Sequence, residues 1–195
     1  TSVFPINAGA SSGAGCTIPI LSQTQLPIRS VEEWFHHAPP KMGSQHWRDG
    51  RSAKELAKAW LRTGIPRMPD ELKLLLDRHS ALAGFIGEAA YPEFVTPLDR
   101  FRGESRNHDL VITGRVDRRK VVVCVEAKAD ESFGKLICEA LVDAKPYSKV
   151  PDRIALLSQS IFGRAIDSAL GGLRYQLLHE VAGTLIEAEN RGADL

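Results

Sequence analysis

Two apolar, β-branched runs separated by a charged reversal constrain the fold of this chain more than any other feature. The runs occupy residues 109–114 and 121–126, and the segment between them is rich in Arg and Lys and begins with Gly114. Runs rich in Val, Ile and Thr are typical of strands, and a charged, Gly-containing segment between two such runs is typical of a turn. The sequence therefore predicts a β-hairpin of two antiparallel strands.

The charged residues at the open end of this hairpin have a definite spacing. Asp109 begins the first run, Glu126 ends the second, and Lys128 follows two residues later. If the turn centres near residues 117 and 118, Asp109 lies directly opposite Glu126, and directly opposed residues point to the same face of a sheet. The period of two along a strand returns Lys128 to that face, whereas a one-residue slip in register would separate Asp109 from the other two.

Two opposed carboxylates repel each other, and a bound Mg²⁺ would remove the conflict. Mg²⁺ is a hard cation that accepts one or two carboxylates together with water and phosphate oxygens, and the nearby Lys128 is suited to hold or deprotonate an attacking water. The spacing indicates a divalent-metal site for phosphodiester cleavage. The alternative is that Glu126 and Lys128 are the solvated end of a buried strand and that Asp109 is a turn residue.

Composition limits the classes of protein to which the chain can belong. Its 195 residues are 43% hydrophobic and 25% charged, which is ordinary for one soluble globular domain. The net charge of +1 excludes a uniformly basic protein, so any nucleic-acid-binding surface must be local. Three cysteines without zinc spacing predict a reducing, cytoplasmic environment, and no apolar run is long enough to predict a membrane span.

The pattern of apolar residues and caps predicts three segments. Residues 1–28 are rich in Gly, Ser and Ala and predict an irregular arm; residues 29–79 predict a helical cap, with Ser-x-x-Glu capping boxes at Ser30 and Ser52. Residues 80–195 predict an α/β core. Its expected elements are a helix at 81–90, a strand at 94–98, the hairpin, a helix at 133–143, a strand at 153–158 and a long C-terminal helix from about residue 173.

This order, with Asp109 on one strand and Glu126-Ala127-Lys128 on the next, resembles the PD-(D/E)XK superfamily of nucleases, which includes restriction and repair enzymes. The resemblance covers roughly residues 80–160, and the phrase from Val125 to Gly134 is similar to an uncharacterised bacterial branch. His108 stands where the superfamily often has Pro. The resemblance implies a restriction-endonuclease-like core of helix, three strands, helix and strand.

The resemblance also implies roles for individual residues. Asp109 and Glu126 would ligate Mg²⁺ or Mn²⁺ together with the backbone carbonyl of Ala127, and Lys128 would sit near the attacking water. An acidic residue on the first core helix often approaches the metal in these enzymes, and Glu88 is the matching candidate, with an ordinary ion pair on a helix face as the alternative. Gln176 could hold phosphate or orient Lys128, as a Gln does on a helix beside the site in some relatives.

Local basic residues are candidates for contact with nucleic acid. The hairpin turn carries Arg115, Arg118, Arg119 and Lys120, and Arg100, Arg102 and Arg106 precede the hairpin. The loop around Trp47 carries Arg48 and Arg51, a composition suited to a nucleic-acid backbone or a stacked base. The alternatives are a solvated turn and a Trp that packs the helices together.

The sequence thus predicts a Mg²⁺-dependent nuclease, most simply an endonuclease acting on DNA in the cytoplasm, with no membrane partner. A homodimer is possible, because many enzymes of the superfamily dimerise to cut both strands. The alternative is a nuclease-fold protein that binds nucleic acid or acts as a scaffold without cleaving, since a fold does not guarantee activity. A small-molecule metallohydrolase is less favoured, because histidine ligands are lacking.

Overall fold

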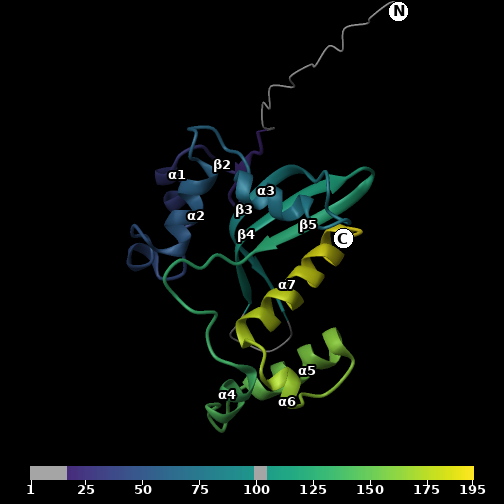
Figure 1. Ribbon diagram of the computed structural model, residues 1–195. Coiled ribbons are helices and arrows are strands. Elements are labelled where there is room, and N and C mark those ends of the chain that lie inside the picture. The colour runs from purple at the N-terminus through teal and green to yellow at the C-terminus, as the bar shows by residue number, and fades with distance from the viewer. Residues whose placement is uncertain (1–16, 99–104) are drawn as a thin grey trace, which may run out of the picture.

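The protein has a mixed α/β fold in the computed structural model, which describes residues 17–98 and 105–195 (Figure 1). The strands are β1 (Ile20–Leu21), β2 (Pro27–Ile28), β3 (Ile86–Thr96), β4 (Arg106–Val116) and β5 (Arg119–Val125). The helices are α1 (Val31–His37), α2 (Ser52–Trp60), α3 (Asp70–Asp77), α4 (Ile137–Val142), α5 (Val150–Phe162), α6 (Ser168–Gly171) and α7 (Tyr175–Arg191), with a 3-10 turn at Gly43–Gln45. No helix in the described part of the chain is long and apolar enough to cross a membrane.

The strands form one open, mixed sheet in the order β2-β1-β3-β4-β5. Strand β1 runs parallel to β3, and every other neighbouring pair is antiparallel. Strands β4 and β5 form the predicted hairpin, in which Val116 pairs with Arg119 across a turn at Asp117 and Arg118. Asp117 has a φ of 54°, a left-handed conformation that short hairpin turns require and that Asp tolerates. The predicted hairpin and its register are confirmed.

Helices cover both faces of the sheet. On one face, Trp34 of α1, Trp60 of α2 and Leu76 of α3 share a core with Leu110 and Ile112 of β4. On the other face, α7 crosses strands β3, β4 and β5 (Figure 1). The N-terminal helices therefore form a cap on the sheet, as predicted, and the sheet is buried between this cap and α7.

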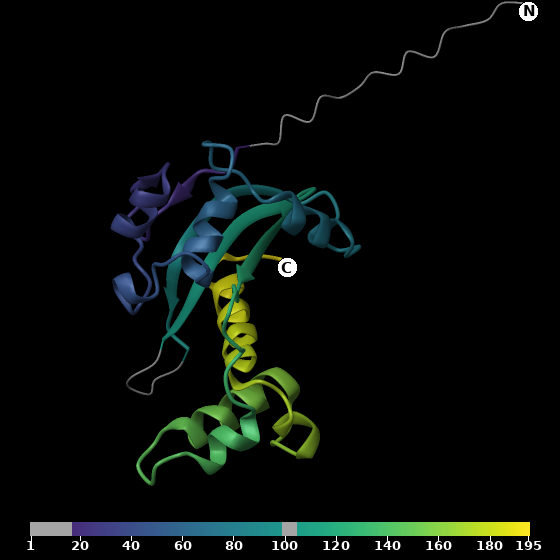
Figure 2. The same ribbon diagram turned by 60° about the vertical axis from the view of Figure 1, so that its left-hand side comes forward.

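Helices α4, α5 and α6 gather in a separate lobe at one end of the molecule (Figure 2). Their apolar residues pack against the first half of α7 in a second core that includes Ile137, Ile154, Leu157 and Leu178. Helix α7 thus belongs to both parts: its N-terminal half holds the helical lobe, and its C-terminal half lies on the sheet. The predicted long C-terminal helix is confirmed.

Two predicted elements of the core are wrong in type. The segment expected as a helix at 81–90 contributes its second half to strand β3, because its backbone groups pair with both β1 and β4 at the centre of the sheet. The segment expected as a strand at 153–158 lies inside helix α5, which begins with Pro151 in its first turn and ends at Gly163 in the left-handed conformation. Ile154 and Leu157, three residues apart, bury one face of this helix.

These differences alter the order of elements. All of residues 126–195 are described, and they form helices and loops without a strand, so a final core strand is not found there. Within the arm predicted for residues 1–28, residues 20–21 and 27–28 pair into the sheet instead of remaining irregular, whereas residues 1–16 lie outside the described part. The predicted α/β class holds; the finer restriction-endonuclease-like core is not reproduced element by element.

Candidate active site

Three acidic side chains lie on, or directly after, three neighbouring strands. In the β3–β4 ladder, Pro92 pairs with Leu110 and Phe94 pairs with His108, so Glu93 and Asp109 between them are opposed. In the β4–β5 ladder, Leu110 pairs with Val125, so the next residues, Asp109 and Glu126, are also opposed. All three carboxylates line one pocket of about 160 Å³. The predicted opposition of Asp109 and Glu126 is confirmed, and Glu93 is added to it.

The backbone is irregular at this point of the sheet. Glu93 has a φ of 48°, which is uncommon for a residue other than Gly. Tyr91 and Phe94 are three residues apart, so a regular strand would place them on opposite faces, yet both rings pack on Arg191 of α7. The alternation of side chains therefore reverses at Glu93, which turns the Glu93 carboxylate toward the cap. Such local backbone strain is often found at functional sites.

Residues from the cap and from α7 complete the pocket. Lys41, His46, Arg51 and Ser52 come from the cap, and Gln176 comes from the first turn of α7. Arg51 is held at the rim by Asp130, 3.2 Å away, and its side chain is 42% exposed. Glu131 also lines the pocket, so cationic groups border a group of four carboxylates.

Glu126 is the most strongly bonded of the three acids. Its Oε1 accepts hydrogen bonds from the Lys128 ammonium, at 2.5 Å, and from the Gln176 amide, while its Oε2 forms an ion pair with Arg106. The Glu126 side chain is only 6% exposed, so these charge-assisted bonds are made largely out of water. Glu126, Lys128 and Gln176, all predicted as site residues, are thus brought into direct contact.

Asp109 and Glu93 are crowded and largely buried. The Asp109 Oδ2 accepts a hydrogen bond of 2.7 Å from the backbone N–H of Ala127, and burial nevertheless raises the pKa of this carboxyl. Burial also raises the pKa of Glu93 to about 7, with a further contribution from the negative charge of Asp109, although the Asn107 amide at 2.5 Å opposes the shift. Ala127 acts through its N–H; the structure does not show its carbonyl as a ligand.

The chemistry of the donors fits a hard divalent cation, because Glu93, Asp109 and Glu126 supply carboxylate oxygens to one pocket, but these three do not form a group with metal-ligand proximity among the described residues. Burial is the main cause of the raised pKa values of Glu93 and Asp109, and a bound cation would favour the charged forms of both carboxyls. A carboxylate oxygen has about two acceptor positions, and the described residues use two on Oε1 of Glu126 but one on Oε2. Glu126 therefore retains capacity for one further ligand.

A buried ion network supports the site from the side of α7. Arg106 joins Glu126 to Glu180 of α7, with its Nε 2.5 Å from the Glu180 Oε2. Glu180 also contacts the Nδ1 of His108 at 2.9 Å, and the His108 side chain is fully buried. Gly183 permits this close approach of α7, because a Cβ there would lie 2.8 Å from the His108 ring. The network fixes the Arg106 guanidinium beneath the pocket.

Glu180 and His108 also lie near Cys124, and their potential ligand atoms fall within 4.8 Å of one another. This is the one group of His, Cys and acidic residues with metal-ligand proximity in the described part of the chain. Burial raises the pKa of the Cys124 thiol to about 12, which disfavours the thiolate that a metal needs, and Glu180 is already bonded to Arg106 and His108. These contacts favour a structural role.

Several predicted site residues lie elsewhere. Glu88 is on strand β3 rather than on a helix; its side chain is 56% exposed and lies 3.4 Å from Arg115. The predicted helix around Glu88 is therefore wrong, and Glu88 does not line the pocket, whereas Glu93 on the same strand does.

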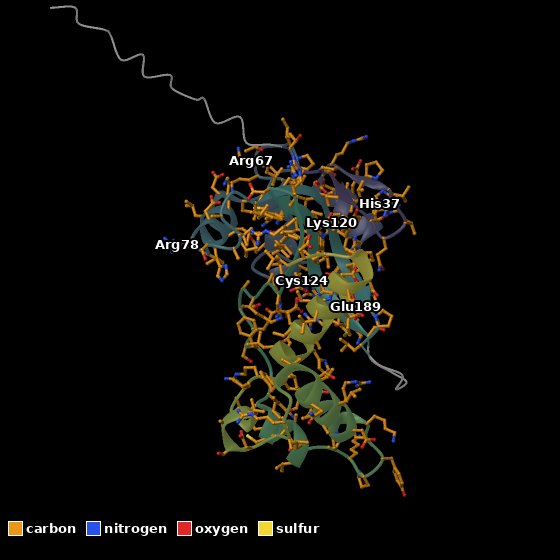
Figure 3. All side chains as sticks on the ribbon, turned by 90° about the vertical axis from the view of Figure 1, so that its right-hand side faces the viewer. His37, Arg67, Arg78, Lys120, Cys124 and Glu189 are labelled. Atoms are coloured by element: carbon orange, nitrogen blue, oxygen red, sulfur yellow. The ribbon has the colours of Figure 1, made fainter. Side chains whose placement is uncertain are left out.

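The basic residues of the hairpin turn are also distant from the carboxylates. From Asp109 to Arg115 is six residues of strand, or about 20 Å. Arg115, Arg118, Arg119 and Lys120 lie at that far end of β4 and β5, and Figure 3 shows Lys120 well away from the helical lobe. They remain candidates only for a remote contact. Arg100 and Arg102 lie outside the described residues, and Arg106 is buried in the ion network.

Two roles were predicted for the loop around Trp47: contact with nucleic acid, and packing of the helices by the Trp ring. Trp47 stacks on Phe35 with ring centroids 5.2 Å apart and packs against the main core, so the packing role is confirmed for the aromatic ring. Arg48 is exposed and does not line the pocket, whereas Arg51 does.

Sequence reasoning missed Glu93 and Glu180 as parts of the site. The signal for Glu93 was present, because it falls opposite Asp109 once residues 86–96 are taken as a strand that pairs with β4. The predicted helix at residues 81–90 excluded this strand, and with it the opposition of Glu93 and Asp109. Glu180 could have been found only from its spacing of four residues from Gln176, which places both on one face of α7.

The comparisons with known proteins give one match. A family model described as a domain of unknown function, DUF6946, matches residues 27–195. The chain belongs to the DUF6946 family. The matched region includes every residue of the candidate site named above, so the pocket lies within the DUF6946 domain. No curated protein and no solved structure matches the chain significantly.

Proposed function

We propose that this DUF6946 protein is a Mg²⁺-dependent nuclease that hydrolyses phosphodiester bonds, with DNA as the favoured substrate. The observation that carries the proposal is the set of three carboxylates, Glu93, Asp109 and Glu126, which line one pocket with Lys128 and Gln176. The restriction-endonuclease-like relationship inferred from the sequence is supported by the hairpin register and by the site, and it is proposed here at that level only.

Glu93, Asp109 and Glu126 would hold the cation, Mg²⁺ or Mn²⁺, through their oxygens. Bound there, the ion would supply Lewis acidity toward a phosphate oxygen and a water molecule. Burial raises the pKa of Glu93, with a smaller contribution from Asp109, and a bound cation would favour the charged forms of both carboxyls.

The residues of the chain would position the reacting groups. The Lys128 ammonium lies 2.5 Å from Glu126 and beside the Phe133 ring, at 5.9 Å, so it is fixed where it can donate to a water or to a phosphate oxygen. Because the Lys128 ammonium is already bonded to the Glu126 carboxylate, we assign it to orienting and stabilising rather than to taking a proton. The Gln176 amide holds Glu126 in place, and Arg51 at the rim would contact a phosphate.

A cleavage assay tests the proposal. Purified protein is incubated with plasmid and with single-stranded DNA, in Mg²⁺, Mn²⁺ or a chelator. We expect cleavage that requires a divalent ion and that falls at least about 100-fold in Asp109→Asn and Lys128→Ala, the size of effect that one electrostatic group contributes to a transition state. Cleavage that survives chelation, or that is unchanged in Lys128→Ala, would overturn the mechanism.

Two acidic residues of strand β3 provide a matched comparison. Glu93→Gln should abolish cleavage, because its carboxylate lines the pocket, whereas Glu88→Gln should cleave at the wild-type rate, because Glu88 is exposed and pairs with Arg115. The opposite order of effects would restore Glu88 as the acidic partner.

One observation favours the second candidate function, a catalytically silent protein that binds nucleic acid. Arg106, Lys128 and Gln176 together bond both oxygens of Glu126, so the site is internally neutralised in part. Thermal unfolding with and without Mg²⁺ separates the two. If the ion stabilises the wild type but not Asp109→Asn, the site binds metal; if neither variant responds and neither cleaves, the silent protein is favoured. A homodimer, needed for paired cuts by one site per chain, remains a prediction.

A further inference from the structure

A second, larger hollow adjoins the candidate active site. Its volume is about 980 Å³, and it is bordered by the helical lobe, by the first turns of α7 and by the start of β4. It shares Lys41, Arg106, Asn107 and Gln176 with the pocket that holds the three carboxylates. The two hollows therefore lie side by side, and a chain-like ligand long enough to pass these shared residues would reach both.

The larger hollow combines positive charge with aromatic surface. Lys41, Lys135 and Lys145 line it, and Asp143 is the one acidic residue of its lining, paired with Lys135 at 2.7 Å. Arg106 also lines the hollow but forms ion pairs with Glu126 and Glu180, so the three ammonium groups against one carboxylate leave an excess of two positive charges. Phosphates of a nucleic-acid strand bind such ammonium groups and release counterions as they do so.

Tyr147 is the aromatic residue that the fold leaves open. It lies in the loop between α4 and α5, lines the hollow and is 96% exposed, so packing within the chain does not account for it. Tyr175, at the start of α7, lines the same hollow. Base stacking on aromatic side chains beside a basic groove is the usual way in which proteins bind single strands.

We propose that this hollow, the strand groove, binds an unpaired stretch of nucleic acid whose bases stack on Tyr147 and whose phosphates contact Lys41 and Lys145. A duplex keeps its bases stacked inside, so only unpaired nucleotides can place a base in a concave hollow. The inference rests on the proposed function of the adjoining site and gives it a substrate class: single strands, or duplexes with single-stranded ends.

Binding is measured apart from cleavage. Fluorescence anisotropy in a chelator follows labelled 12-nucleotide DNA, the same sequence as RNA, and the DNA duplex. We expect single strands to bind at least about 10-fold more tightly than the duplex. Preference for DNA over RNA, or the reverse, identifies the source of the strand. Equal affinity for single-stranded and duplex DNA would overturn the inference.

Substitutions at exposed positions locate the bound strand. Tyr147→Ala should weaken binding by about 10-fold and Tyr147→Phe by less than about 2-fold, because stacking needs the ring and not the hydroxyl. Lys145→Ala should weaken binding and lower the slope of log K against log salt by about 0.7, the value for one phosphate contact on a single strand. Lys73→Ala, an exposed lysine on α3 outside the groove, is the control and should change neither.

An acidic peptide tests the competing occupant. Polyglutamate should displace the oligonucleotide poorly, and its weak binding should not depend on Tyr147. Equal competition that is insensitive to Tyr147→Ala would show that the groove recognises charge alone and would overturn the proposal.

Failure of the groove and failure of the nuclease are distinguishable. If the wild type cleaves but Tyr147→Ala binds and cleaves single strands as the wild type does, the groove is wrong and the nuclease stands. If single strands bind through Tyr147 and Lys145 but are not cut with any divalent ion, the groove stands and the nuclease is wrong.

Discussion

Replacement of Glu93 by Gln should remove part of the dependence of the free energy of unfolding on pH. The pKa of the Glu93 carboxyl is raised from 4.5 to about 7 by burial and by Asp109, so the folded chain binds this proton more tightly than the unfolded chain does. Below pH 4.5, Glu93 makes its full contribution to the free energy of unfolding. This contribution is lost as the pH rises from 4.5 through 7. Stability falls with pH in that window.

The magnitude follows from the two pKa values. The rise in the pKa of Glu93 from 4.5 to about 7 should lower the free energy of unfolding by roughly 3 kcal/mol between pH 4 and pH 8. Gln carries no charge at any pH and keeps an amide that can bond Asn107, so Glu93→Gln should be more stable than the wild type by up to about 3 kcal/mol at pH 8, and similar to it at pH 4.

Urea denaturation of both proteins in a chelator, at half-unit steps from pH 4 to pH 8, measures this difference. Added Mg²⁺ at pH 8 should stabilise the wild type more than Glu93→Gln, because the ion would bind the charged Glu93 carboxylate, which the substitution removes. A difference in unfolding free energy between the two proteins that does not change with pH would refute the reasoning, since it would mean that Glu93 titrates as an exposed carboxyl does.

Two further predictions concern the packing of α7 and the thiols. Gly183→Ala should lower the free energy of unfolding by about 1–3 kcal/mol, because its Cβ would lie 2.8 Å from the buried His108 ring, whereas Gly171→Ala meets the Cβ of Cys138 at an ordinary 3.5 Å and should be nearly neutral in urea denaturation. Iodoacetamide followed by mass spectrometry should label the exposed Cys138 well before Cys124, whose pKa burial raises to about 12; equal rates would contradict the packing of α7 on the sheet.

The hairpin and its charged end could be predicted from the sequence because both depend on local information. The β-branched runs determine the strands, the turn at residues 117 and 118 determines the register, and the register brings Asp109 opposite Glu126. The cap helix after Ser30 followed in the same way, since the Ser30 hydroxyl accepts the Glu33 N–H at 3.1 Å. For the helix after Ser52, the predicted cap is wrong, because Ser52 is its first residue and its hydroxyl bonds Glu131 instead.

The parts that depend on pairing between distant segments could not be predicted in this way. Strand β3 satisfies its backbone groups through β1 and β4, and nothing within residues 86–96 reveals those partners. The apolar run around Ile154 is compatible with a buried strand or with a helix, and the second core of the helical lobe decides for the helix. The reversal of side-chain alternation at Glu93 depends on backbone geometry that a period of two does not contain.

Arg106 shows why the acidic site can exist in the folded chain before any ion is bound. Its guanidinium touches Glu126 and Glu180, and its positive charge also favours ionisation of Glu93 and Asp109. This one cation therefore offsets part of the repulsion among four acids that are buried or partly buried. Burial nevertheless raises the pKa of Glu93 and of Asp109, so desolvation outweighs the attraction of the nearby cations. A divalent ion held by these carboxylates would supply the positive charge that favours their ionised forms.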